Sequence, residues 1–173
     1  MAGPKQKLVI IGNGETAELA YDYFTRDTDF VVVGFSVEKA YIDNESLFGL
    51  PVVRFEHIED YFHPNEHTAF VAVSYTQLNR LRSRLYNETK KKGYHLCTYI
   101  SPKANVGSNV VVGENCFILE NVTLQRGVKI GDCVTIWVGS TVGHRSTVGD
   151  YCFLAMHVAV SGFCGVGAYS FLG

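Results

Sequence analysis

The sequence predicts a chain in two parts, a small α/β domain over about residues 1–97 and a parallel β-solenoid over residues 98–173. Strand-like and helix-like segments alternate in the first half, which is typical of a parallel sheet covered by helices. In the second half, aliphatic residues recur at every sixth position, a period that fits neither a helix nor ordinary strands. The change comes abruptly after "TYISPKA", residues 98–104.

The alternation in the first half predicts a shortened Rossmann-like domain. Apolar runs that end in glycine or polar residues read as strands, and apolar residues at helical spacing read as helices. The last helix should have Leu78, Leu81 and Leu85 on one face and Gly93 as its C-cap. The expected strands cover 7–12, 30–35, 50–55 and 68–73, and the expected helices cover 15–24, 56–62 and 76–93.

The period of six in the second half holds without a slip. Small or β-branched residues stand four positions after the aliphatic ones, among them Cys116, Cys152 and Cys164, and glycine often follows the aliphatic residue directly. A fixed short period predicts coils that stack on one another, with the aliphatic side chain inward and glycine permitting a tight corner. The aliphatic positions are Ile100, Val106, Val112, Ile118, Leu124, Ile130, Ile136, Val142, Val148, Leu154, Val160, Val166 and Leu172.

Composition excludes several classes of protein. The 173 residues are 47% hydrophobic and 18% charged with a net charge of −2, so a nucleic-acid partner is not expected. No apolar run approaches the ~20 residues of a membrane helix, and the N-terminus lacks the layout of a signal peptide. The five cysteines form no CxxC pair, and Cys116, Cys152 and Cys164 are expected to be buried in the inward small-residue position, which favours reduced thiols in the cytoplasm and no zinc site.

The second half, with the junction "GYHLCTYISPKANVGSNVVVGENC" (93–116), resembles the hexapeptide-repeat acyltransferases. With an α/β domain in front, it is most similar to the nucleotide-sugar acetyltransferases and sialic-acid O-acetyltransferases of that type. The resemblance implies a left-handed β-helix with three hexads per coil, acetyl-CoA as donor, a homotrimer and no metal. It also implies a nucleotide-linked sugar as acceptor, most often a 4-amino-4,6-dideoxy sugar, and a role in O-antigen biosynthesis.

A glycine turn, "GNGETA" (12–17), lies between the first strand and the first helix. Such a turn can bring backbone N–H groups and a helix N-terminus to a phosphate. NAD is not expected, because the second strand ends near Ser36, where NAD binding needs an acidic residue. The simpler interpretation is that the glycines only form a tight turn. The resemblance implies a substrate site made by Gly12, Asn13, Gly14, Glu15, Thr16, Ser36, Ser74 and Tyr75.

His144 follows an inward aliphatic residue and a glycine, so it is expected to face outward at a corner. Residues eighteen apart should stack, which places His144 between Arg126 and Gly162, and the glycine is expected to leave room for a reacting group. Acetylation of an amine needs a base for the proton of the attacking nitrogen, and histidine suits this task near neutral pH. The resemblance implies that His144 is this general base; the alternative is a solvated corner residue.

His157 is the second catalytic candidate. The resembling enzymes often have an acidic residue beside the first histidine and a second histidine nine positions later, where this chain has Arg145 and Phe153. His157 is predicted to serve a variant of that second role and, with Gly162, to contact CoA. The alternative for His157 is an outward residue at a subunit contact.

Two hypotheses remain open about the activity of the expected trimer, and the first is the acetyltransferase described above. Trp137, His157 and Phe163 are expected to form an apolar outward face that a closed trimer would bury. The chain stops in mid-repeat at "VGAYSFLG", and it lacks the usual acid and second histidine. The second hypothesis is therefore a non-catalytic nucleotide-sugar-binding or scaffold trimer without CoA-dependent activity. A hexapeptide enzyme of the carbonic-anhydrase kind would need three metal-binding histidines, and the solenoid has two.

Overall fold

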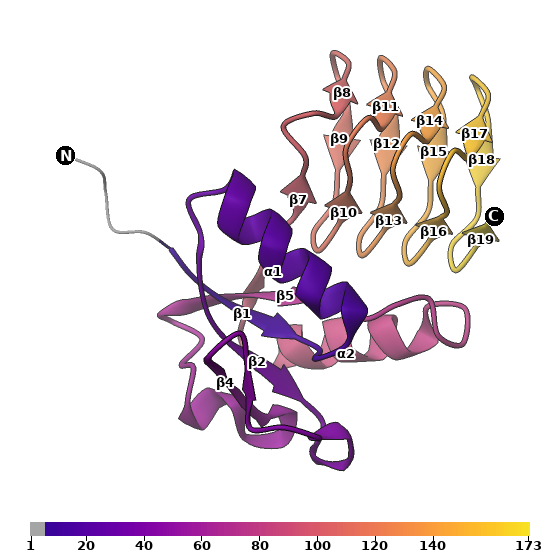
Figure 1. Cartoon of the computed structure of the whole chain (residues 1–173). Helices are drawn as coiled ribbons and strands as arrows, with labels where there is room; N and C mark the ends of the chain where they lie inside the picture. Colours follow the sequence, from indigo (N-terminus) through magenta and orange to yellow (C-terminus); the bar gives the residue numbers. More distant parts are fainter. Residues whose placement is uncertain (1–5) are drawn as a thin grey trace. The chain divides into compact units, whose positions relative to one another are not determined.

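The computed structural model describes residues 6–173, which form two compact units (Figure 1). One unit contains residues 6–74 and 84–97, and the other contains residues 75–83 and 98–173. The first is an α/β unit and the second is a stack of short parallel strands, as the sequence predicts at this level. Among residues 6–173, no helix has both the length and the apolar composition that a membrane span requires.

A six-stranded sheet forms the centre of the first unit, in the order β3-β4-β2-β1-β5-β6. All neighbouring strands are parallel except β3 and β4, which are antiparallel. Since parallel strands share one carboxyl edge, β1, β2, β4 and β5 all end on the same side of the sheet. The strands are β1 (Lys7–Ile11), β2 (Val31–Val37), β3 (Ser46–Leu47), β4 (Leu50–Arg54), β5 (His67–Val71) and β6 (His95–Leu96).

Helix α1 (Glu15–Asp27) covers the sheet with the apolar face that its spacing predicts. Ala17, Ala20 and Phe24 are fully buried, and the Phe24 ring meets the Phe70 ring of β5 edge-on at 5.0 Å. The helix ends where the backbone and hydroxyl of Thr28 both donate to the carbonyl of Phe24. Two short 3-10 helices, η1 (Lys39–Tyr41) and η2 (Phe55–Asp60), follow β2 and β4, so the helix expected over 56–62 is a 3-10 helix that begins one residue earlier.

Helix α2 (Arg80–Lys91) is shorter than the 76–93 that its sequence predicts. Gln77, Leu78 and Asn79 have φ values of 53°, 52° and 63°, in the left-handed region that a right-handed helix cannot contain. Leu78 is therefore not on the apolar face of the helix and is 56% exposed, which corrects the prediction. The other end is as predicted, since Gly93 has a φ of 90° and its N–H donates to the carbonyl of Lys90.

Thirteen two-residue strands build the second unit as three stacks of parallel strands, consistent with a left-handed β-helix (Figure 1). Paired residues are eighteen apart, as in Tyr99 with Phe117. The stacks are β7-β10-β13-β16-β19, β8-β11-β14-β17 and β9-β12-β15-β18. The strands are β7 (Tyr99–Ile100), β8 (Asn105–Val106), β9 (Val111–Val112), β10 (Phe117–Ile118), β11 (Thr123–Leu124), β12 (Lys129–Ile130), β13 (Thr135–Ile136), β14 (Thr141–Val142), β15 (Thr147–Val148), β16 (Phe153–Leu154), β17 (Ala159–Val160), β18 (Gly165–Val166) and β19 (Phe171–Leu172).

The aliphatic ladder lines the interior of the solenoid, as the period predicts. Its central members, Ile118 to Leu154, are buried, whereas Ile100 and Val106 are 38% and 43% exposed because the first described coil has a neighbour on one side only. The same end effect corrects the expectation for Cys164, whose thiol is exposed in the last coil. Cys116 is buried as expected, and burial raises the pKa of its thiol to about 12.

Serines four residues after an aliphatic position form hydrogen bonds between neighbouring coils. The hydroxyl of Ser140 donates to the carbonyl of Ala155 at 2.7 Å and accepts from the N–H of Val158 at 3.1 Å. Ser146 repeats this arrangement with residues 161 and 164. Small and β-branched residues occupy this position because the side chain must fit inside the coil, and the serines among them also bond to the backbone of the next coil.

The glycines that follow the aliphatic residues have a different role from the one expected. Gly107, Gly113, Gly131, Gly143 and Gly149 do not have positive φ values, so their backbone does not require glycine at a corner. Instead, a Cβ atom at position 143 would lie 2.4 Å from the backbone nitrogen of Gly162 in the next coil. These glycines are needed because the backbones of stacked coils approach closely.

Residues 75–83 are held against the strand stack that contains β13, β16 and β19. Arg82 is 3% exposed and donates to the hydroxyl of Thr135 and to the carbonyls of Cys133 and Cys152. The Tyr75 ring lies 5.0 Å from the Phe153 ring and 4.9 Å from the Phe171 ring. This segment therefore belongs to the second unit, although it comes before the solenoid in the sequence.

Candidate active site

The glycine turn follows β1 and leads into α1. Gly12 has a φ of 133°, its N–H donates to the carbonyl of Ser36, and a Cβ atom there would lie 2.6 Å from the carbonyl oxygen of Ala72. Local packing alone therefore requires glycine at position 12. Gly14 is different, because a Cβ atom there would meet nothing within 4 Å. Packing thus explains the glycine at position 12, whereas Gly14 has open space beside it.

The remaining residues predicted at the turn surround it in the first unit. The Asn13 amide donates to the carbonyl of Tyr41 at 2.9 Å, which ties the turn to η1. Glu15 is exposed and Thr16 half-buried in the first turn of α1, whose N-cap makes no side-chain hydrogen bond. Ser36 lies beside Ile11 in β2, and its fully buried hydroxyl has no hydrogen-bond partner within the described chain. An unpartnered buried hydroxyl is costly, and here it lies directly at the turn.

Ser74 and Tyr75 follow β5, and their place at the edge of a sugar pocket stays a prediction. Ser74 is half-buried, and Tyr75 is exposed. The Tyr75 ring packs on Phe153 and Phe171, as described above.

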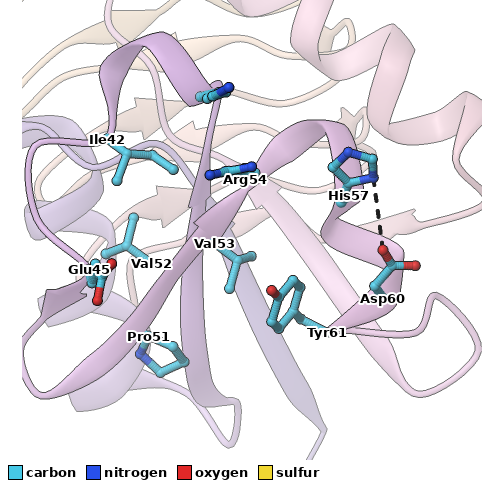
Figure 2. A pocket seen from close by; sticks show the side chains of 10 residues that line it. Ile42, Glu45, Pro51, Val52, Val53, Arg54, His57, Asp60 and Tyr61 are labelled. Carbon is cyan, nitrogen blue, oxygen red and sulfur yellow. Dashed lines mark ion pairs between the residues drawn. The ribbon is translucent and has the colours of Figure 1, made fainter.

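A surface hollow of about 880 Å³ lies beside β4 (Figure 2). Lys39 and Arg54 stand at the carboxyl ends of β2 and β4, the edge where parallel sheets bind ligands. Neither side chain forms an ion pair or a hydrogen bond within residues 6–173. His57 faces Asp60 at 3.9 Å in the same wall. The full lining is Lys39, Ile42, Glu45, Pro51, Val52, Val53, Arg54, His57, Asp60 and Tyr61.

The sequence pattern did not identify this hollow, which becomes visible only from the sheet order. Lys39 comes two residues after β2, and Arg54 ends the neighbouring parallel strand β4, so both lie at one edge of the sheet. The pKa of the nearby Glu56 carboxyl lies below its ordinary value, because backbone N–H groups, including that of Lys39, donate to it and the charges of His57 and Arg54 favour its ionised form. The hollow therefore combines an apolar floor with two unpaired cations.

His144 lies at the corner between β14 and β15, exposed as predicted. Its backbone N–H donates to Oε1 of Gln125 at 2.8 Å, and its Nδ1 lies 3.1 Å from the same oxygen. The Phe163 ring meets the imidazole edge-on at 4.9 Å. Gln125 follows β11 in the preceding coil, and the sequence analysis did not identify it.

The role of Gly162 needs correction. Its place beside His144 is as expected, but a Cβ atom at position 162 would lie 2.5 Å from Cε1 of His144. The space above Gly162 is filled by the imidazole itself rather than left open for a reacting group. On the other side, the N–H of Arg145 donates to the carbonyl of Arg126, and the Arg145 guanidinium lies 5.6 Å over the Phe163 ring.

His157 lies at a different corner, between β16 and β17, with a φ of 58°. Its imidazole packs over Gly139, since a Cβ atom there would lie 2.5 Å from Cε1 of His157. The β14 and β17 strands separate this corner from that of His144, so one chain does not bring the two rings together. Trp137 lies before the corner of His157, and Phe163 lies at the corner of His144. The three residues expected on one apolar face therefore occupy two corners.

Phe153, which stands where the resembling enzymes often have a second histidine, is buried in an aromatic cluster with Trp137, Tyr75 and Phe171. It offers no polar atom for chemistry. Within residues 6–173, no group of three or more His, Cys, Asp or Glu side chains is arranged to hold a metal ion.

Comparisons with known proteins identify structures of the same fold, although no family model matches the chain. The acetyltransferase domain of PglB from Neisseria gonorrhoeae FA1090 superposes with a TM-score of 0.74 and 18% identity over 97% of this chain and 91% of that one. WeeI from Acinetobacter baumannii AYE gives a TM-score of 0.78 and 17% identity over 96% and 77%. PerB from Caulobacter crescentus, solved with CoA and GDP-perosamine, gives a TM-score of 0.57 and 21% identity over 96% of this chain and 88% of that one.

One curated protein is similar in sequence. The acyl-[acyl-carrier-protein]–UDP-N-acetylglucosamine O-acyltransferase of Ectopseudomonas mendocina (strain ymp) is 30% identical in an alignment that covers 38% of this chain. The chain spans about a third, 35%, of the length of that relative. The structural neighbours include a perosamine N-acetyltransferase and an acetyltransferase domain that was solved with acetyl coenzyme A. The resemblance to the hexapeptide-repeat sugar acetyltransferases is therefore confirmed at the level of the fold.

Proposed function

We propose that this protein is an acetyltransferase that moves the acetyl group of acetyl-CoA to the amine of a nucleotide-linked sugar of the 4-amino-4,6-dideoxy class. The observation that carries the proposal is His144, an exposed imidazole with a fixed orientation at a corner of the solenoid. The same fold occurs in PglB, whose acetyltransferase domain was solved with acetyl coenzyme A, and in PerB, solved with CoA and GDP-perosamine.

His144 is the general base of the proposed reaction. As the amine nitrogen attacks the thioester carbonyl, a C–N bond forms and the nitrogen loses a proton to the imidazole. The C–S bond then breaks, and the CoA sulfur leaves and takes up a proton. Histidine is suited to this exchange because it binds and releases protons near neutral pH. A backbone N–H from a neighbouring coil is suited to stabilise the oxyanion that forms on the carbonyl oxygen.

The first unit is the proposed nucleotide-sugar-binding domain, Rossmann-like and extending over residues 1–97. Three features at one sheet edge support this assignment: open space beside Gly14, the unpartnered hydroxyl of Ser36, and the two cations of the hollow, Lys39 and Arg54. Phosphates bind well at helix N-termini and to Arg and Lys side chains. The apolar floor of the hollow is suited to the flat face of a nucleobase.

A cytoplasmic homotrimer is the proposed form of the protein. All five cysteines are free thiols, which suits a reducing compartment. Met156 and Phe163 are 62% and 68% exposed at the two histidine corners. Closed cyclic assembly would cover these side chains and could bring His144 of one copy near His157 of another. In that arrangement His157 and Gly162 would contact CoA.

A non-catalytic binding trimer is the second candidate. The burial of Phe153 in an aromatic cluster favours it, because this position offers no imidazole where the resembling enzymes often have a second histidine. Arg145 likewise gives His144 no acidic partner, since it lies over Phe163.

Calorimetry and a transfer assay separate the two functions. Titration with acetyl-CoA and with GDP-linked and UDP-linked 4-amino sugars should show saturable binding of the donor and of one acceptor. Mixing both should release CoA thiol and form an N-acetyl sugar that mass spectrometry detects. Binding of the sugar without binding of acetyl-CoA would support the binding trimer and reject the enzyme.

A further inference from the structure

The hydrogen bonds around His144 determine which ring nitrogen carries the proton. The backbone N–H of His144 donates to the side-chain amide of Gln125 at 2.8 Å. A backbone N–H can only donate, so the atom of Gln125 that faces it must be the carbonyl oxygen and not the NH₂ group. The side-chain amide of Gln125 is therefore oriented by the main chain.

The same oxygen lies 3.1 Å from Nδ1 of the imidazole. A carbonyl oxygen has two lone pairs and no proton to give, so Nδ1 must be the donor in this contact. In the neutral ring only one nitrogen carries a proton, which leaves Nε2 unprotonated with a free lone pair. A histidine in this tautomer is ready to accept a proton at Nε2.

Other contacts keep the ring in this position. Gly162 lies against one side of the imidazole, and the Phe163 ring meets it at 4.9 Å with an interplanar angle of 85°. The charged groups at this corner are the guanidinium groups of Arg126 and Arg145, and both are exposed. Neither contributes an acceptor for Nδ1–H, because arginine side chains only donate.

We propose that Gln125 is a positioning residue that holds His144 in the Nδ1–H tautomer, with Nε2 as the basic nitrogen. This inference rests on the proposed function, in which His144 is the general base. Gln125 occupies, one coil earlier, the position of Gly143, where a glycine would leave Nδ1 and the N–H of His144 unpaired. The resembling enzymes often use an acidic neighbour for this task, and this chain uses a neutral amide from another coil.

The neutral partner has a chemical consequence. A carboxylate would both orient the ring and stabilise the imidazolium, whereas an amide oxygen orients the ring and adds no charge. Gln125→Glu is accordingly the informative substitution, since it keeps the acceptor and adds the charge.

The first test reads the tautomer directly and needs no activity. Long-range ¹H–¹⁵N NMR of the full chain with ¹⁵N-labelled histidine should show His144 with a protonated Nδ1 and an unprotonated Nε2. The His144 signals are assigned by their loss in His144→Ala, and His157 is the internal reference. Gln125→Ala should abolish the preference for Nδ1–H, and Gln125→Glu should keep it. A His144 ring protonated at Nε2 in the unsubstituted protein would overturn the proposal.

The second test reads catalysis. Gln125→Ala should lower kcat about 10–100-fold, as loss of an orienting partner commonly does, with little change in either KM. Gln125→Glu should restore most of the rate and move the acid limb of the pH–rate profile to higher pH, because the carboxylate favours the imidazolium. Lys129→Ala, an exposed change in the same coil, controls for general loosening of the solenoid. An unchanged kcat in Gln125→Ala, or no rescue by Gln125→Glu, would contradict the positioning role.

The two tests also separate this inference from the proposed function. If NMR shows the Nδ1–H tautomer but His144→Ala retains full turnover, the proposed base is wrong and the positioning of the ring by Gln125 stands. If His144→Ala is inactive but the tautomer is Nε2–H, the base is right and the inference about Gln125 fails.

Discussion

The corners of His144 and His157 are built from the same parts and differ in hydrogen bonding. Each imidazole lies over a glycine eighteen residues away, Gly162 in one case and Gly139 in the other. The His144 ring contacts Gln125, whereas the His157 ring has no hydrogen-bond partner in the part of the chain that the structure describes. Both rings pack over a glycine, so this packing does not distinguish them, and the hydrogen bond is what marks His144 as a potential base.

Removing each imidazole would test this difference with the largest expected effect. His144→Ala should cut kcat by roughly 10²–10⁴-fold, the usual contribution of a positioned base. His157→Ala should cost less than about tenfold, because its ring is not oriented by a hydrogen bond. Steady-state kinetics with acetyl-CoA and an amino-sugar acceptor give both values, and thermal melting checks folding. A larger loss in His157→Ala than in His144→Ala would reverse the assignment.

Adding a methyl group beneath each imidazole tests whether the position of that ring affects turnover. Gly162→Ala would place Cβ 2.5 Å from Cε1 of His144 and so displace the ring, which should lower kcat about tenfold. Gly139→Ala should instead lower the Tm, because alanine at a φ of 73° costs about 1–2 kcal/mol, with little effect on kcat.

A double substitution checks the mechanism of the Gly162 effect. Combined with His144→Ala, the Gly162→Ala change should have no further effect on turnover, because the ring that it displaces is already absent. An additive loss in the double variant would mean that position 162 acts on something other than His144.

Substitutions in the hollow should weaken binding of the nucleotide sugar and leave the chemical step unchanged. This result would show that the first unit binds the sugar and the second carries out the chemistry. Arg54→Ala should weaken nucleotide-sugar binding about 3–10-fold, the net value of one ordinary hydrogen bond at an exposed site. Binding of acetyl-CoA and kcat at saturation should not change. Lys7→Ala, an exposed cation at the amino end of β1, is the matched control. Calorimetry would refute the assignment if both variants bind the sugar as tightly as the unchanged protein.

The smallest expected effect is electrostatic and concerns the His144 corner alone. Removing the positive charge of Arg126 favours the imidazolium, so Arg126→Ala should move the acid limb of the pH–rate profile upward by a few tenths of a pH unit, the size expected for exposed charges. High salt should shrink this difference because it screens exposed charges. A downward shift would show that Arg126 does not act on the base through its charge.

Much of the architecture could be predicted because each coil meets only its neighbours, so that a period in the sequence becomes a period in space. The aliphatic ladder, the stacking of residues eighteen apart and the exposure of His144 all follow from this regularity. The alternating first half predicted β1, α1, β2, β4 and β5 within a few residues. The boundary at residue 97 and the assignment of all eight substrate-binding residues stay predictions.

The features that were missed depend on contacts between segments that no local pattern records. Gln125 contacts His144 because residue 125 stacks on residue 143, a relation that the eighteen-residue register would have supplied. The late start of α2 follows from the left-handed conformation of residues 77–79, which leucine and glutamine do not signal. Cys164 shares its pattern with Cys152 and differs in exposure, because coils with one neighbour are covered on one side only.

The eighteen-residue register also bears on how such a chain can change its length during evolution. Inserting or deleting eighteen residues keeps every later side chain in its column, whereas a change of any other length moves the inward aliphatic residues to a different sheet or to the outside. Residues 125–163 form an exception, because Gln125, His144 and Phe163 must remain in adjacent coils. The segment between residues 125 and 163 should therefore keep a constant length. Gain or loss of whole coils elsewhere must also preserve the contacts of Arg82 and Tyr75 with the stack that contains β13, β16 and β19.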